Sequence, residues 1–175
     1  PNAMVQVSPV TKFHSGAGYQ YEDSVIYGFT HTNKGHWNLC HIPLLPVTGT
    51  PTPGDYCSPF SHERESAAPG YYQVFLDRYG VDAQLSSTLR CAFHKYTYPA
   101  GAAASLLADL QRSNEHVRAW DIRKEGDNVF AGWQQTGEKM YFYAVANRPV
   151  TGIEPVVEGD REVRIVRFGE GDGAL

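Results

Sequence analysis

The sequence has few cysteines and no long apolar run, and both shortages exclude classes of protein. Its three cysteines, Cys40, Cys57 and Cys91, have no CxxC spacing, so a zinc site of the usual kind is not expected. They leave two alternatives open: one disulfide with one free thiol, or three buried thiols. No stretch approaches the roughly 18 apolar residues that span a bilayer, so we predict no membrane span.

The sequence also lacks clusters of basic residues. Its 15 Lys and Arg are outnumbered by 19 Asp and Glu, giving a net charge of −4, and the basic residues are scattered along the chain. Nucleic acids and anionic membrane surfaces attract proteins through concentrated positive charge. We therefore expect neither as a partner.

Recognisable catalytic motifs are missing as well. No two carboxylates stand out as a glycosidase dyad, there is no nucleophile elbow, and Gly16 and Gly18 do not lead into the helix of a phosphate loop. His62 and Glu63 could form an acid/base pair. Adjacent strand residues point to opposite faces, however, and a solvated charged loop is the favoured interpretation. We predict no catalytic residue and no metal site in this chain.

What the sequence does have is aromatic residues and turn formers. Aromatics make up 13% of the 175 residues, and 17 Gly and 11 Pro are spread along the chain. Short apolar or alternating runs between such turns are typical of an all-β fold, and we predict one antiparallel β-sandwich of two packed sheets. The expected strands are 4–10, 19–21, 24–30, 42–47, 71–76, 81–89, 90–98, 117–123, 128–134, 140–146 and 162–168.

Three segments carry more specific predictions. Residues 42–47 contain Pro43 and Pro46, which favours an edge strand. Residues 140–146 are apolar on both faces, which favours a central strand with cover on each side. Residues 102–111 have the composition of a helix, but their β-rich neighbours favour a strand.

The segment His31–His41 (HTNKGHWNLCH) is the strongest candidate for a binding site. It concentrates His31, Asn33, His36 and Trp37 in one polar loop. Three histidines suggest a metal, but their spacing matches no known ligand pattern. An exposed Trp offers a flat apolar face to a sugar ring, and Asn and His offer hydrogen bonds to its hydroxyls. The alternative is that Trp37 is a buried anchor for the loop.

Several ordered motifs resemble glycoside hydrolase family 92. Met4-Val5-Gln6-Val7-Ser8-Pro9 is similar to the opening of that family, and Pro43-Leu44-Leu45-Pro46-Val47-Thr48-Gly49 continues the match. The most specific parts are Ser58-Pro59-Phe60-Ser61-His62-Glu63 and Ala68-Pro69-Gly70-Tyr71-Tyr72. Gly132-Trp133 and Met140-Tyr141-Phe142 match later landmarks, so the resemblance covers nearly the whole chain.

The resemblance implies an exo-acting, inverting α-mannosidase, often specific for α-1,2 linkages, that uses calcium and is secreted, periplasmic or on the cell surface. It also implies a two-domain protein in which residues 1–175 form an N-terminal β-sandwich, incomplete at both ends. The catalytic carboxylates would belong to a C-terminal (α/α)6 barrel absent from this chain. Trp37, His36, Asn33 and His31 would then line part of a mannoside pocket at the domain interface.

The chain departs from the family pattern in two places. Many members carry a Gly/Asp-rich stretch where this chain has residues 34–41, and members commonly have Pro-Phe-Gly where it has Pro1-Asn2-Ala3. A function of another class, a free-standing carbohydrate-binding module, stays open beside the enzyme fragment. An uncovered apolar face would favour the fragment, and a polar surface with one aromatic groove would favour the module.

Overall fold

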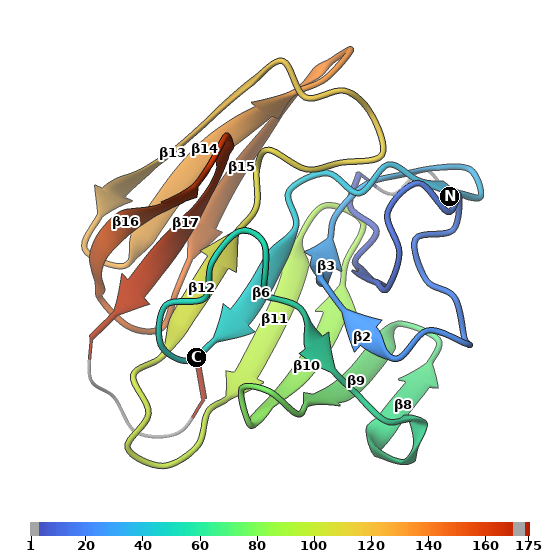
Figure 1. Ribbon diagram of the computed structural model, residues 1–175, viewed down its shortest axis with the longest axis horizontal. Coiled ribbons are helices and arrows are strands. Elements are labelled where there is room, and N and C mark those ends of the chain that lie inside the picture. The colour runs from blue at the N-terminus through green and yellow to red at the C-terminus, as the bar shows by residue number, and fades with distance from the viewer. Residues whose placement is uncertain (1–3, 170–173) are drawn as a thin grey trace.

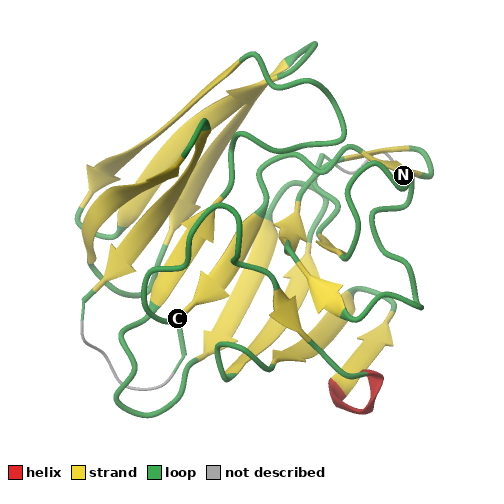
Figure 2. Ribbon diagram, in the orientation of Figure 1, coloured by secondary structure: helices red, strands yellow, loops and turns green. Residues whose placement is uncertain are grey.

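The computed structural model describes residues 4–169 and 174–175, and most of the regular structure in that part is β-strand (Figures 1 and 2). Every strand pairing there is antiparallel, which confirms the prediction of an all-β sandwich. The helical exception among these residues is one 3-10 turn, His62–Arg64 (η1), drawn red in Figure 2. The departure from the family at residues 1–3 lies outside the described residues.

The strands form three larger sheets and two short pairs. The six-stranded sheet has the order β1-β3-β6-β12-β17-β16, with bounds Ser8–Val10 (β1), Gly28–Thr30 (β3), Leu44–Val47 (β6), Ser105–Ala108 (β12), Arg161–Phe168 (β17) and Val150–Glu158 (β16). The four-stranded sheet has the order β11-β10-β9-β8, with bounds Ala92–Thr97 (β11), Val81–Ser87 (β10), Tyr71–Leu76 (β9) and Glu65–Ala68 (β8). The three-stranded sheet is Ala119–Gly126 (β13), Val129–Gln135 (β14) and Lys139–Val145 (β15). The short pairs are Val25–Ile26 (β2) with Ser58–Pro59 (β7), and Asn33–Lys34 (β4) with Trp37–Asn38 (β5).

One hydrophobic core joins the three larger sheets. It contains Phe29 from β3, Val74 from β9, Phe130 from β14 and Ile165 from β17, all buried. Strand β13 contacts β16, and β10 contacts β6. Figure 1 shows the three-stranded sheet layered against β16 and β17. Burial of these apolar faces is the main force that holds the layers together.

The alternating strands are confirmed most clearly in β10 and β11. Val81, Ala83 and Leu85 of β10 are buried, while the residues between them are half-buried. In β11 the side chains of Phe93 and Lys95 are exposed on one face, as the alternation predicts. Side chains alternate between faces along a strand, so a period of two residues marks a half-buried strand.

The prediction of an edge position for residues 42–47 is wrong. Strand β6 lies between β3 and β12 and is buried along its length. Its pairing with β3 is limited to Phe29 and Leu44, however, while β12 pairs with all four of its residues. Pro46 therefore lies beyond the stretch that pairs with β3, and this limited pairing is how an interior strand tolerates a proline.

The prediction of a central position for residues 140–146 is also wrong. Strand β15 is at the edge of the three-stranded sheet, and Tyr141, Tyr143 and Val145 on its outer face are 71%, 70% and 66% exposed. Its inner face, including Phe142, packs on the core. Both faces of β15 are apolar, as the sequence indicates, but only one of them is covered within the described residues.

Other segments divide between confirmed and wrong predictions. Within residues 102–111 the strand β12 is confirmed. Residues 24–30 form two strands interrupted at Tyr27, and residues 4–7 and 19–21 are not in strands. Strand β16 was not predicted. At the C-terminal end Ala174 forms a β-bridge with Thr97, and Gly173 lies outside the described residues.

The cysteines fit neither predicted alternative. All three are free thiols: Cys40 is buried, Cys57 is half-buried and Cys91 is exposed. Three thiols without a disulfide are thus correct, but three buried thiols are not.

Candidate functional site

The segment expected to be a loop is a tight β-hairpin. Asn33 pairs with Asn38 and Lys34 with Trp37, so that Gly35 and His36 form a two-residue turn. Gly35 has φ +63°, and no atom lies within 4 Å of the position that its Cβ would take. Two-residue hairpin turns need a positive φ at the first central position, which Gly supplies at little cost. The hairpin holds Trp37 and Lys34 beside each other at its tip.

Asn38 fixes the base of this hairpin. Asn38 is buried. Its side-chain Nδ2 donates to Ser8 Oγ at 2.9 Å, and its side-chain Oδ1 accepts from the Cys40 backbone N–H at 2.8 Å. A Cβ on Gly18 would approach the Asn38 amide to 2.6 Å, so the neighbouring turn must have glycine there. Asn38, rather than Trp37, is therefore the buried anchor of the segment.

Trp37 lies on the surface of the hairpin. Its side chain is 54% exposed. One part of the indole lies over Gly16, where an added Cβ would be 3.2 Å from Cζ3, and the His36 ring is tilted beside it with centroids 5.3 Å apart. A planar apolar ring that is supported on one side and open on the other suits stacking on a ligand ring.

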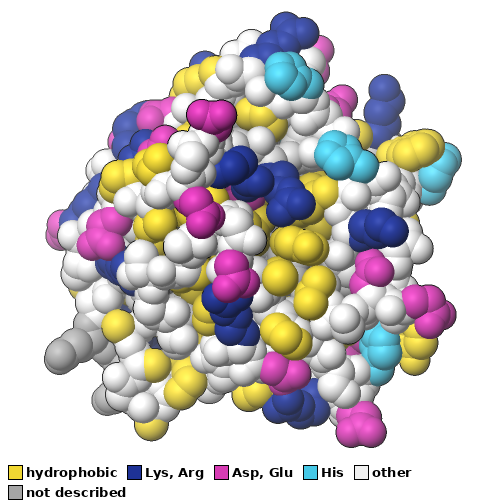
Figure 3. Space-filling view, viewed as in Figure 1, with side chains coloured by type: hydrophobic (Ala, Val, Ile, Leu, Met, Phe, Trp, Pro, Cys, Tyr) yellow, Lys and Arg dark blue, Asp and Glu magenta, His cyan; other side chains and the backbone are white. Residues whose placement is uncertain are grey.

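A shallow pocket of about 280 Å³ lies next to Trp37. It is lined by His14, Gly16, Lys34, Trp37, Asn38, Leu39, Asn114 and Glu115. In Figure 3 histidine and basic side chains gather near hydrophobic atoms at the upper right, over the N-terminal part of the chain. The volume is near the lower end of small-molecule sites, roughly 300–1,000 Å³, and suits a single ring-sized group.

Glu115 is the functional candidate that sequence reasoning missed. Its Oε2 accepts hydrogen bonds from His41 Nε2 at 3.0 Å and from Thr136 Oγ1 at 2.8 Å. His41 is buried, and its Nδ1 accepts from Thr32 Oγ1 at 2.8 Å. Burial lowers the pKa of His41, against the opposing effect of Glu115, so a neutral ring with its proton on Nε2 satisfies all these partners. The network holds one carboxylate in a fixed orientation at the pocket.

His31 does not line this pocket. Its Nδ1 lies 2.8 Å from the Ile42 carbonyl, its Nε2 lies 3.1 Å from His94 Nε2, and His94 Nδ1 lies 2.6 Å from the Tyr96 hydroxyl. Since the carbonyl only accepts, donation runs one way: Tyr96 to His94, His94 to His31, and His31 to Ile42. Both ring nitrogens of His94 are thus hydrogen-bonded, which makes it a structural histidine. Of the predicted site residues, Trp37 lines the pocket and His36 lies beside its ring, whereas Asn33 is on the hairpin face of Asn38, and neither Asn33 nor His31 lines the pocket.

These histidines give a prediction for the pH dependence of stability. Burial lowers the pKa of His31 from 6.5 to about 4, and burial lowers those of His94 and His41 as well. Between about pH 6.5 and 4 the unfolded chain therefore binds more protons at His31, so stability should decrease as the pH is lowered, by up to about 1.4 kcal/mol per pH unit from this residue. The lowered pKa values of His94 and His41 act in the same direction. Urea unfolding at pH 7 and pH 5 measures this difference.

Two variants control the pH experiment. His31→Gln should reduce the loss of stability between pH 7 and pH 5, whereas the exposed His36→Gln should leave it unchanged. An unchanged pH dependence in His31→Gln would contradict the assignment of a neutral, buried pair.

The structure pairs His62 with Glu65, whereas the sequence suggested a pair with Glu63. His62 Nδ1 lies 2.5 Å from Glu65 Oε2, not against Glu63, and its Nε2 lies 2.8 Å from the Tyr21 carbonyl. Both nitrogens face acceptors, and the hydrogen bond to Glu65 raises the pKa of His62. Glu65 also accepts from the hydroxyls of Tyr19 and Tyr72. The cluster ties η1 to β9 and the preceding loop, and it leaves Glu63 outside.

Within residues 4–169 and 174–175, no three His, Cys, Asp or Glu side chains converge closely enough to bind a metal ion. In the same part of the chain, no helix has both the length and the apolar character required to cross a bilayer.

Comparison with known proteins places these features in a family context. Residues 1–170 match the family model described as Glycosyl hydrolase family 92 N-terminal domain. A search of curated proteins found no match.

Solved structures match over almost the whole chain. The family GH92 α-mannosidase BT3965 from Bacteroides thetaiotaomicron is 24% identical, with a TM-score of 0.86 over 99% of this chain and 29% of that one. The GH92 family glycosyl hydrolase ccman5 is 26% identical, with a TM-score of 0.79 over 99% of this chain and 28% of that one. The family GH92 inverting mannosidase BT2199 from the same Bacteroides species is 20% identical, with a TM-score of 0.80 over 99% and 26%. The chain thus spans less than a third of the length of these proteins.

Proposed function

The chain belongs to the glycosyl hydrolase family 92 N-terminal domains, and we propose that it is the non-catalytic domain of an inverting exo-α-mannosidase. In this proposal the Trp37 pocket forms one wall of a mannoside site, and the catalytic groups come from a C-terminal helical barrel of the same polypeptide. Trp37 carries the proposal, because it offers an open indole face beside hydrogen-bonding groups.

The acidic groups near the pocket support a non-catalytic role. Inversion uses an acid and a base whose carboxyl groups lie about 6.5–9.5 Å apart on either side of the scissile bond. Among the residues that line the pocket, Glu115 is the one carboxylate, and His41 and Thr136 already bind its Oε2. The second acid would have to come from another part of the protein. We expect the 175-residue chain alone to release no mannose from an α-mannoside; turnover by the pure chain would refute this assignment.

An uncovered apolar strip supports docking of a further domain. Met4, Leu89 and Phe93 are 73%, 62% and 68% exposed, and the Met4 backbone donates to the Leu89 carbonyl at 2.8 Å. Large apolar side chains exposed next to each other are typical of interaction surfaces. We assign this strip, at the turn between β10 and β11, to contact with the helical barrel.

Calcium, the α-1,2 linkage and a secreted, periplasmic or cell-surface location complete the proposal and rest on family membership. Because no three His, Cys, Asp or Glu side chains converge within the described residues, we expect the calcium ligands mainly in the C-terminal domain. Activity of the full-length enzyme before and after chelation tests the calcium requirement. The natural substrate would be a mannose-containing glycan.

The Trp37→Ala variant of the full-length enzyme tests the role of the pocket. Loss of one stacking contact should raise KM for an α-mannoside about tenfold. Because the side chain is 54% exposed, the melting temperature should change little. Steady-state kinetics and thermal unfolding measure the two effects.

The matched control is Tyr21→Ala, which removes another ring that is 64% exposed outside the pocket. It should leave KM unchanged. If Trp37→Ala instead lowered the melting temperature sharply while kcat/KM held, Trp37 would be a structural residue and the proposed pocket would be wrong.

A further inference from the structure

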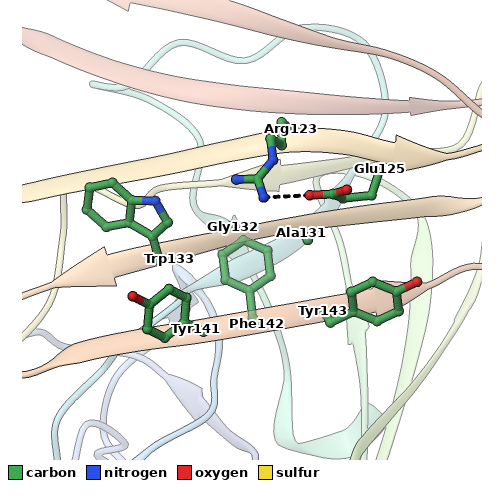
Figure 4. Close-up of a pocket in the computed structure, with 8 residues that line it drawn as sticks. All are labelled: Arg123, Glu125, Ala131, Gly132, Trp133, Tyr141, Phe142 and Tyr143. Carbon is green, nitrogen blue, oxygen red and sulfur yellow. Dashed lines mark ion pairs between the residues drawn. The ribbon is translucent and has the colours of Figure 1, made fainter.

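The outer face of the three-stranded sheet forms a second, larger groove. Its volume is about 540 Å³, and Figure 4 shows the residues that line it: Arg123, Glu125, Ala131, Gly132, Trp133, Tyr141, Phe142 and Tyr143. They come from β13, β14 and β15. None of them lines the Trp37 pocket, which is built from loops and the β4–β5 hairpin.

Register explains the shape of this groove. Ala131 of β14 pairs with Arg123 on one side and with Tyr143 on the other. A small residue thus lies between two long side chains, so the middle strand is the floor and the outer strands are the walls. Two residues further along β14, Trp133 pairs with Asp121 and with Tyr141, and its indole closes one end of the groove.

One wall is polar and held in place. Arg123 Nη1 lies 3.2 Å from Asp121 Oδ2, and Arg123 Nη2 lies 2.5 Å from Glu125 Oε1. The three side chains are spaced two residues apart on β13 and therefore share one face. Two carboxylates fix the guanidinium and leave further donor and acceptor positions open to solvent, since its side chain is 57% exposed.

The other wall is aromatic. Tyr141 and Tyr143 are 71% and 70% exposed, and Figure 4 shows them at opposite ends of the groove, with Tyr141 beside Trp133. The Lys139 ammonium lies 3.6 Å from the centre of the Trp133 ring, so one face of that indole is already covered. The same ammonium lies 5.4 Å from the centre of the Tyr141 ring, so Tyr143 offers the most open apolar surface of this wall.

We propose that this groove binds a neutral oligosaccharide. An aromatic wall opposite a fixed row of donors and acceptors matches a pyranose, which has an apolar C–H face and hydroxyls at its edge. The charges on this face, from Asp121, Arg123, Glu125 and Lys139, cancel, so nothing selects an anionic ligand such as a nucleic acid. The core of a protein interface, by contrast, is depleted of charged residues, and burying this ion-pair row would cost desolvation energy.

This site goes beyond the proposed mannosidase pocket and does not depend on it. A glycan chain held here would keep the protein on its substrate while hydrolysis occurs elsewhere, a role that rests on the proposed function, whereas binding itself does not. The two sites are distinguished experimentally by their tryptophans, Trp133 for the groove and Trp37 for the pocket.

The test is a titration of the 175-residue chain with mannotetraose, cellotetraose and maltotetraose, followed by NMR of the tryptophan indole N–H signals. At least one tetrasaccharide should shift the Trp133 signal in a saturable way. Tyr143→Ala should weaken that binding about tenfold, as expected for loss of one ring contact. Arg123→Met, which keeps the length of the side chain but not its donors, should weaken it as well. Phe93→Ala removes an aromatic ring 68% exposed on another sheet and should leave binding unchanged.

Each result that contradicts the glycan site has a different meaning. If none of the three probes shifts the Trp133 signal, or if Tyr143→Ala and Arg123→Met bind as well as the parent chain, the groove is not a glycan site. A Trp133 shift that depends on protein concentration alone would assign this face to a second copy of the chain and overturn the proposal. A shift confined to Trp37 would also overturn it, while supporting the mannoside pocket.

Discussion

Replacing Asp109 with Ala should lower the free energy of unfolding by about 3 kcal/mol, the lower end of the effect of breaking a buried ion pair. Asp109 is fully buried, and its Oδ2 accepts from Arg161 Nη2 at 2.6 Å and from the Tyr56 hydroxyl at 2.7 Å. The variant leaves the buried Tyr56 hydroxyl without this acceptor. Arg161 is 40% exposed and can turn to water, which is why the lower end applies.

Urea unfolding measures this loss, and Asp109→Asn is the matched comparison. The amide keeps the volume and one acceptor oxygen for Tyr56 but loses the charge that faces Arg161. It should destabilise the chain by less than Asp109→Ala does. Equal urea midpoints for Asp109→Ala and the parent chain would show that this cluster does not stabilise the fold.

The second large effect is expected at Gly132, in the middle of β14. A Cβ added there would lie 2.1 Å from the Asp121 carbonyl oxygen and 2.7 Å from Phe142 Cζ. The carbonyl belongs to β13, whose residue Ile122 pairs with Gly132, so it cannot move away without disturbing the sheet. Gly132→Ala should therefore destabilise the chain by about 3 kcal/mol, the upper part of the range for overpacking.

Gly137→Ala is the control for this variant. Gly137 is exposed, and no atom lies within 4 Å of the Cβ position that Ala would take. Its urea midpoint should stay within a few tenths of a molar unit of the parent value, in line with surface substitutions of about 0.5 kcal/mol or less. If both glycine variants were equally stable, the close contact at Gly132 would have relaxed and the explanation would be wrong.

Local pattern predicted the strands well, because alternation is a property of each strand alone. Alternation predicts strands at 81–89 and 90–98, and the structure has them at Val81–Ser87 and Ala92–Thr97. Strand β16 was missed because Gly152, Glu154 and Pro155 interrupt its apolar pattern, and its strand character depends on eight pairs with β17. Edge or interior position depends on which strands become neighbours, so β6 and β15 were placed wrongly.

The candidate site was predictable only in part for the same reason. Trp37 and its polar neighbours are adjacent in sequence, so their concentration was visible. Glu115 reaches the pocket through His41, which is 74 residues away, and no local signal marks such a pair. The Ser-His-Glu-rich segment at residues 61–65 showed the right residue types, but the three-residue separation of His62 and Glu65 becomes a contact only through the turn η1.

Asn114 joins distant parts of the chain at the pocket near Trp37. Asn114 accepts from the His14 backbone at 2.6 Å, donates from its amide to the Asn38 carbonyl at 2.6 Å, and donates from its backbone to the Leu39 carbonyl at 2.9 Å. All three partners are main-chain atoms. These hydrogen bonds therefore use no side-chain atom of positions 14 and 39. His14 has φ +59°, so a library at position 14 should be limited to residues that tolerate the left-handed region, such as Gly, Asn and Asp, and within that limit it could explore new ligand preferences at the pocket.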